Sequence, residues 1–230
     1  LNVNIILYIR TRKHRSCLNS FLNQETIMIT NREEVLANAL RVFAKMNYEK
    51  ASLTEIAKAC GLSKAGLIYY YPFKLDLFIA VIDKYVFSMH STANKFRFTY
   101  TSLSEFIDKY VEGIKRTMHI LVSVLKDDDR QPGCSPNFYY YNLLMQVRQY
   151  YPDVEKKIES LFNQDYTVWE SAIQLAKDSG EIRHDLNTKD SAFLFRQAFL
   201  GLAYEQSFLS GLDTKMLVQK FRFIYSLLKS

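Results

Sequence analysis

Glycine, proline and cysteine are scarce in this chain of 230 residues, which holds seven, four and three of them. So few glycines and prolines favour long helices over a loop-rich β fold. The cysteines (Cys17, Cys60 and Cys134) are too widely spaced for a disulfide framework or a metal site, which favours a reducing, intracellular setting in the cytoplasm. No apolar run approaches the roughly 18 residues of a membrane span, and the apolar residues 3–9 precede a basic cluster, the reverse of a signal peptide.

The charge is unevenly distributed along the chain, whose net charge is +6. Residues 1–27 carry four basic side chains and one acidic one, and residues 28–90 carry eight and six, whereas the remainder is nearly balanced. This asymmetry favours an anionic partner for the N-terminal part. We expect residues 1–27 to be an unstructured or non-native extension before Met28; the alternative is a basic arm that enters a DNA minor groove.

Apolar residues recur at helical spacing along most of the chain, which predicts an all-α fold. Capping boxes at Thr30 with Glu33 and at Ser52 with Glu55 begin the first two helices, and Ser63 caps the third. Asn47 is expected to end the first helix and Pro72 the third. Further helices are predicted over 75–90, 103–125, 137–150, 154–179, 189–209 and 214–229.

The segment from Ser52 to Lys74 predicts a helix-turn-helix. Ala57 is small enough for a second helix to cross closely, Gly61 can adopt the positive φ of a tight turn, and Leu67 fills the angle between the helices. Ile56, Leu62 and Tyr70 extend the same buried side. The second helix of such a motif lies in the DNA major groove.

Over residues 31–82 the chain resembles the TetR family of bacterial transcriptional regulators. The resemblance rests on the order of its features: a capping box, a small residue, the glycine of the turn, a run of aromatic residues and a lysine. The resemblance implies a DNA-binding domain over 28–74 and a ligand-binding and dimerisation domain over 75–230. It also assigns DNA contacts around the recognition helix to Ser52, Thr54, Ser63, Lys64, Ala65, Gly66, Tyr69, Tyr70 and Lys74. Ile68, Gly66 and Phe73 depart from the usual family residues.

The resemblance implies a small-molecule pocket and a two-fold dimer in the body. No second His or carboxylate lies at ligand spacing from His119, so we expect no metal, and we expect no cofactor. Apolar and aromatic residues at helical spacing suggest an apolar or aromatic effector, with a candidate lining of Met118, His119, Val122, Phe138, Tyr141, Met145, Tyr166, Trp169, Ile173 and Phe199. Each of these residues is individually more typical of plain core. Apolar stripes on the last two helices predict a dimer interface of Ala198, Gly201, Leu202, Glu205, Leu217, Phe221, Ile224 and Leu228.

Two other classes of function compete with a ligand-responsive repressor of a palindromic operator. An enzyme is disfavoured because the four histidines show no catalytic grouping and no phosphate-binding glycine loop or H-E-x-x-H motif is present. A helical adaptor that docks its helix-turn-helix on protein is disfavoured by Lys64 and Lys74 on the expected contact face.

Overall fold

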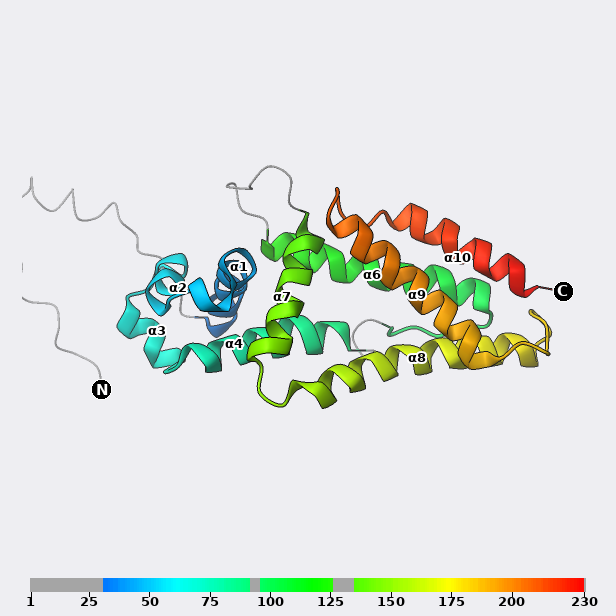
Figure 1. The fold of residues 1–230 in the computed structure, drawn as a ribbon, viewed down its shortest axis with the longest axis horizontal. Coiled ribbons are helices and arrows are strands. Elements are labelled where there is room, and N and C mark those ends of the chain that lie inside the picture. Colours follow the sequence, from blue (N-terminus) through cyan, green and yellow to red (C-terminus); the bar gives the residue numbers. More distant parts are fainter. Residues whose placement is uncertain (1–30, 92–95, 126–134, 230) are drawn as a thin grey trace, which may run out of the picture.

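The computed structural model describes residues 31–91, 96–125 and 135–229, and within these ranges the regular secondary structure is helical throughout, as predicted. The molecule is elongated, with α1 to α3 at one end and the C-terminus at the other (Figure 1). The predicted extension over 1–27, the predicted cap Thr30, and Cys17 and Cys134 lie outside the described residues.

The head consists of α1 (Arg32–Lys50), α2 (Leu53–Ala59) and α3 (Lys64–Tyr70). Asn31 caps α1 by accepting a hydrogen bond from the Glu33 backbone N–H at 2.9 Å. The capping box of Ser52 and Glu55 on α2 is present as predicted, and so is the Ser63 cap on α3. Asn47 has a φ of 64°, which interrupts α1 at the predicted position although hydrogen bonding carries the helix on to Lys50.

A connecting helix follows Pro72 and runs towards the middle of the molecule (Figure 1). It begins as α4 (Lys74–Ile82) and changes into the π-helix η1 (Asp83–Ser88), a widening that helical periodicity did not predict. Among the described residues, no single helix has the length and apolar composition to cross a membrane. Of the described helices, only α3 taken together with α4–η1 has that length and composition, and these two helices are bent by 58° where they meet. The apolar side of that pair is buried in the core of the head.

The body is built from α6 (Leu103–Leu125), α7 (Pro136–Tyr150), α8 (Val154–Asp178), α9 (Thr188–Ser207) and α10 (Thr214–Leu228). These helices agree with the predicted ranges to within a few residues. α8 and α9 pack side by side, α10 lies along α6 and α9, and α7 crosses between head and body (Figure 1). The body core centres on aromatic rings, with Trp169 stacked on Phe195 at 4.5 Å and in edge contact with Phe106 at 4.8 Å between centroids.

The core of the head does not end at the connecting helix. Leu143 and Val147 of α7 and Val154 of α8 belong to the same buried cluster as Leu40 and Phe78. Across this junction, Asn142 Nδ2 donates to the Ala44 carbonyl at 3.0 Å and Gln146 Nε2 to the Phe43 carbonyl at 3.2 Å. α7 is therefore joined directly to α1 by a shared core and two hydrogen bonds.

Candidate DNA-binding head and body cavity

The angle between α2 and α3 is fixed by a few buried residues. Ala57 is almost fully buried and Leu67 completely so, while Gly61 has a φ of +64° and open space where a Cβ would stand. The Leu62 backbone N–H donates to the Ala57 carbonyl at 2.9 Å, which closes the turn. This geometry fixes the position of α3 against α2, with one face of α3 buried and the other exposed to solvent.

The outer face of α3 contains the side chains that the resemblance assigned to DNA. Lys64 and Ala65 are exposed at its N-terminus, and Tyr69 is 86% exposed, the largest value among the exposed large hydrophobic side chains. A single exposed aromatic ring is common on protein surfaces, but exposed apolar residues that gather in a patch can mark an interaction site. Tyr70 is half-buried against the core of the head. Lys64 and Tyr69 are thus both exposed on α3, and Gly66 adds no side chain between them.

Ser52 and Ser63 have a structural task as well. They accept capping hydrogen bonds from the Glu55 and Gly66 backbone N–H groups at 3.1 and 3.0 Å, and the hydroxyl hydrogen of Ser63 stays available for an acceptor. Thr54 is exposed in the first turn of α2. Ile68 and Phe73, which depart from the family residues, are also exposed and add apolar surface beside Tyr69.

Lys74 is held by the head rather than extended into solvent. Its Nζ donates to the Tyr48 carbonyl at 2.8 Å and lies 4.3 Å from the centre of the Tyr48 ring. Sequence reasoning missed this contact, because it depends on α1 and α4 meeting side by side. The ammonium therefore sits at a fixed place at the start of α4, where it ties the two helices together.

A cavity of about 60 Å³ lies in the body where the end of the connecting helix meets α6, α7 and α9. Its walls come from several helices and the loop before α10, and they combine apolar side chains with an imidazole, three hydroxyls and an amide: His90, Ile114, Thr117, Met118, Leu121, Pro136, Asn137, Tyr140, Tyr141, Phe199, Ala203 and Leu212. The rings of His90 and Tyr140 lie 4.9 Å apart. Burial strongly raises the pKa of Tyr140, which stays a neutral hydroxyl.

Only part of the predicted lining borders this cavity. Met118, Tyr141 and Phe199 do so. The other seven lie elsewhere: Trp169 and Ile173 are fully buried core residues, Met145 and His119 are exposed, Tyr166 stacks on Phe193, Phe138 packs on Phe208, and Val122 is half-buried outside the lining. Periodicity identified the inward faces but could not tell which inward side chains leave a space between them.

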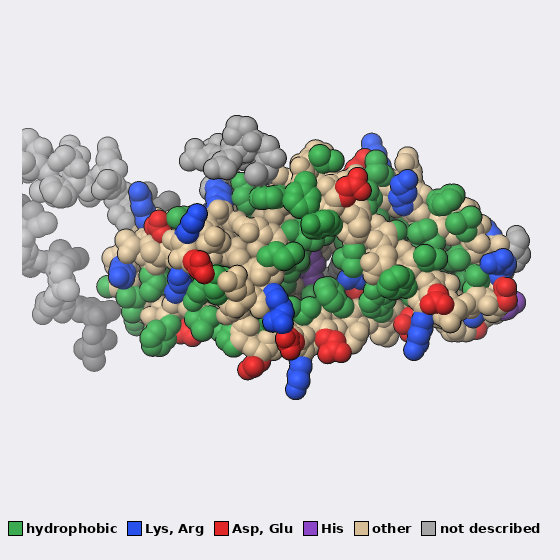
Figure 2. Space-filling model, in the orientation of Figure 1, with side chains coloured by type: hydrophobic (Ala, Val, Ile, Leu, Met, Phe, Trp, Pro, Cys, Tyr) green, Lys and Arg blue, Asp and Glu red, His purple; other side chains and the backbone are tan. Residues whose placement is uncertain are grey.

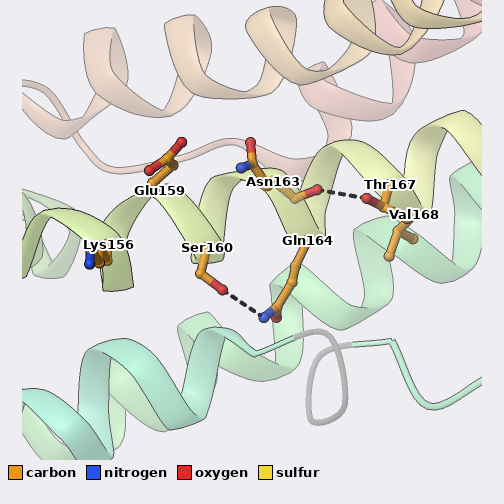
Figure 3. Close-up of a pocket in the computed structure, with 7 residues that line it drawn as sticks. All are labelled: Lys156, Glu159, Ser160, Asn163, Gln164, Thr167 and Val168. Atoms are coloured by element: carbon orange, nitrogen blue, oxygen red, sulfur yellow. Dashed lines mark hydrogen bonds between the residues drawn. The ribbon is translucent and has the colours of Figure 1, made fainter.

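Two larger depressions are open to solvent. The first, of about 470 Å³, is lined only by residues of α8 such as Glu159, Asn163 and Thr167, which lie along one side of that helix (Figure 3). Ser160 and Gln164 project below the helix in this view, where Gln164 Nε2 donates to Ser160 Oγ at 3.3 Å (Figure 3). The second lies beside it, near Phe162 and Tyr166. A one-helix surface cannot enclose a ligand, so the smaller four-element cavity is the better candidate site.

The predicted dimer interface requires a correction on α10. Leu217, Phe221 and Leu228 are buried inside the chain's own body core and are not available to a partner. A second apolar stripe, formed by Met216, Phe223 and Leu227, points outward instead. On α9, Gly201 and Glu205 are exposed and Ala198 and Leu202 half-buried, and Ile224 of α10 is half-buried too. Hydrophobic side chains are spread over α9 and α10 on the face in Figure 2.

No group of three or more His, Cys, Asp and Glu side chains lies close enough to hold a metal ion within the described residues. Cys60 is buried in the core of the head, and desolvation raises the pKa of its thiol to about 11. A thiol with so high a pKa is a poor nucleophile and serves as a small apolar filler.

Comparisons with known proteins agree with this geometry. Residues 35–81 match the family model of bacterial regulatory proteins of the tetR family. An uncharacterized HTH-type transcriptional regulator, YezE of Bacillus subtilis (strain 168), is 24% identical over 181 residues, which are 78% of this chain and 87% of that relative.

Solved structures share the fold at low sequence identity. A TetR-family regulator from Rhodococcus sp. has a TM-score of 0.61 at 14% identity and covers 86% of this chain and 98% of its own. AibR, solved in complex with isovaleryl coenzyme A and operator DNA, has a TM-score of 0.53 at 20% identity, over 85% of this chain and 96% of its own.

Proposed function

We propose that this chain, a member of the TetR family of bacterial transcriptional regulators, is a dimeric repressor that one small effector releases from a palindromic operator. The TetR family is non-enzymatic, and its members bind operator DNA and small-molecule effectors. The observation that carries the proposal is the outer face of α3, where Lys64 and the strongly exposed Tyr69 stand on a rigid helix-turn-helix. A recognition helix of this kind reads base edges with its N-terminal residues.

Individual contacts follow from the positions of the side chains. Lys64, Ala65 and Tyr69 face the major groove, while the hydroxyls of Ser52, Thr54 and Ser63 and the half-buried Tyr70 meet the phosphate backbone. Lys74 holds a phosphate from its fixed place over Tyr48. Phosphate contacts set the register and base contacts choose the sequence, so Lys64 and Tyr69 are the residues that choose it.

Dimerisation supplies the second half-site. One recognition helix reads only a few base pairs, and two heads about 34 Å apart match one turn of DNA. The outward stripe of Met216, Phe223 and Leu227 on α10, together with Ala198, Gly201, Leu202, Glu205 and Ile224, supports a two-fold contact between copies. Gly201 has nothing within 4 Å of a Cβ position in the monomer, which allows a partner helix to approach closely.

Release from DNA follows from the place of the cavity. His90 at the end of the connecting helix and Tyr140 and Tyr141 of α7 all line it. An effector that enlarges the cavity shifts both helices, and α7 passes the shift to α1 through the hydrogen bonds of Asn142 and Gln146. Such a ligand acts only by binding one of the two dimer geometries more tightly than the other.

Fluorescence anisotropy of the purified protein on its own upstream intergenic DNA tests the proposal, at several salt concentrations and with nonspecific competitor. We expect tight binding that survives the competitor and weakens steeply with salt, as phosphate neutralisation requires. Weak binding that the competitor abolishes, with little salt dependence, would favour the alternative of a helical adaptor that docks on protein.

A further inference from the structure

An ion pair is buried in the aromatic core of the body. Arg196 Nη2 of α9 lies 2.9 Å from Asp165 Oδ2 of α8, and the two side chains are only 3% and 5% exposed. Removing both charges from water is expensive, and apolar residues of similar volume often stabilise such a position as well or better. The pair therefore needs an explanation beyond the stability of the body.

Two nitrogens of the Arg196 guanidinium have no hydrogen-bond acceptor, and Asp165 Oδ1 has no hydrogen-bond donor, within the described residues. One nitrogen faces Asp165, whereas Nε and Nη1 are buried and have no hydrogen-bond acceptor within the described residues. Arginine carries its N–H groups in a rigid fork that cannot fold back on itself. Buried donors without acceptors are rare in folded proteins and often indicate a site for another molecule.

The guanidinium lies near one wall of the effector cavity. Phe199, one turn after Arg196 on α9, lines the cavity, and its ring centre is 5.8 Å from the guanidinium carbon. Tyr140 and Tyr141 line the cavity as well, and burial raises the pKa of both hydroxyls. A ligand that extends past Phe199 would therefore meet the guanidinium.

The charge of the pair determines which ligand suits these donors. Asp165 already neutralises Arg196, so a ligand carboxylate would bring an uncompensated charge into a low-dielectric core. An uncharged oxygen acceptor satisfies a guanidinium N–H without that penalty. Resting on the proposed effector site, we infer that the effector is an uncharged, mainly apolar molecule whose carbonyl oxygen accepts a hydrogen bond from Arg196, with its apolar part against Phe199 and Tyr141.

Three small probes of related shape separate the possible ligand chemistries: cyclopentanone, its isostere methylenecyclopentane, and cyclopentanecarboxylate. Binding is followed by the fluorescence of Trp169, the only tryptophan of the chain, which lies one turn from Asp165 on α8, and by the thermal midpoint from circular dichroism. We expect cyclopentanone to bind the full-length protein at least about tenfold more tightly than the other two. Equal binding of the ketone and the alkene, or tighter binding of the carboxylate, overturns the inference.

Two variants of the pair sharpen the test. In the neutral double variant Asp165→Asn/Arg196→Met, the preference for cyclopentanone over methylenecyclopentane should disappear. In Asp165→Asn alone, the arginine charge is no longer compensated, so cyclopentanecarboxylate should become the best of the three probes. If both variants, folded by circular dichroism, keep the wild-type preference, Arg196 does not read the ligand.

The ligand chemistry and the repressor function can fail separately. Operator binding without probe is measured on the same wild-type preparation. A protein that binds its operator but does not prefer the ketone overturns only the effector class, whereas one that prefers the ketone but binds no DNA specifically overturns only the proposed repressor function.

Discussion

Tyr69 is the residue at which DNA affinity and protein stability should separate most cleanly. Its ring is almost fully exposed and its neighbour in contact is Tyr70 of the same helix, so it contributes little to the fold. We predict that Tyr69→Ala weakens operator binding by about 1–3 kcal/mol and leaves the free energy of urea unfolding within about 0.5 kcal/mol of wild type. Unchanged operator affinity in anisotropy titrations would remove Tyr69 from the interface.

A lysine on the same helix should show the base-reading part of the contact. Lys64→Ala is expected to weaken operator binding by about 1–3 kcal/mol and to reduce the discrimination between operator and competitor DNA. Lys58→Ala is the matched control, because Lys58 is also an exposed head lysine but lies in the last turn of α2 and was assigned no DNA contact. Equal discrimination in the two variants would mean that Lys64 attracts DNA only by its charge.

The capping box gives a pH dependence with a definite sign. The backbone N–H of Ser52, and then its hydroxyl, lower the pKa of Glu55. A carboxyl whose folded pKa lies below its unfolded value stabilises the fold above the unfolded value, about 4.3, and loses that effect as the pH falls through the folded pKa. Glu55→Gln should therefore be less stable than wild type at pH 7, with a difference that shrinks in acid unfolding experiments.

At the scale of elements, the π-helix η1 is anchored where head and body meet. Asp83, its first residue, accepts hydrogen bonds from the Tyr151 hydroxyl at 2.7 Å and from Lys157 Nζ at 2.9 Å, and Lys157 also donates to the Tyr151 hydroxyl. π-Helical turns often occur at functional positions. This cluster attaches the connecting helix to the turn between α7 and α8. It lies near the hydrogen bonds by which α7 is joined to α1 of the head.

We predict that Tyr151→Phe loosens this anchor. The variant keeps the edge contact with the Phe87 ring but loses the hydroxyl, which should cost about 1 kcal/mol in urea unfolding and change the effector concentration needed for half-release of DNA. Tyr204→Phe, in an exposed position of α9, is the control. An unaltered release curve with the expected loss of stability would make the cluster a purely structural feature.

Local chemistry allowed the sequence to predict the helices of the head closely, and the reason is visible at Ser52, Ser63 and Pro72. Each acts on its own helix end, so no knowledge of distant contacts is needed. The candidate site in the body depends on contacts between helices. The spacing of Leu217 and Leu228 is the same as that of Met216 and Leu227, and only packing on α6 and α9 decides which stripe is buried. The sequence alone does not predict the ion pair of Asp165 with Arg196 either, because the two residues lie on different helices.

At the scale of the whole molecule, the outward stripe of α10 should decide the oligomeric state. We predict that Phe223→Glu, which places a charge in the centre of that stripe, converts a dimer into a folded monomer in sedimentation velocity experiments, because an unpaired buried charge is costly in an interface. Met145→Glu is the control, since Met145 is as exposed as Phe223 but lies on α7. It should remain dimeric.

The same variant connects assembly to DNA recognition. A monomer presents one recognition helix, so Phe223→Glu should lose nearly all discrimination between a palindromic operator and competitor DNA, although its α3 surface is untouched. A half-site oligonucleotide should bind the variant and wild type with similar affinity per head. If the variant stays dimeric, the partner surface lies away from the outward stripe of α10. If it becomes monomeric yet still prefers the full palindrome, the two heads do not need the body to act together.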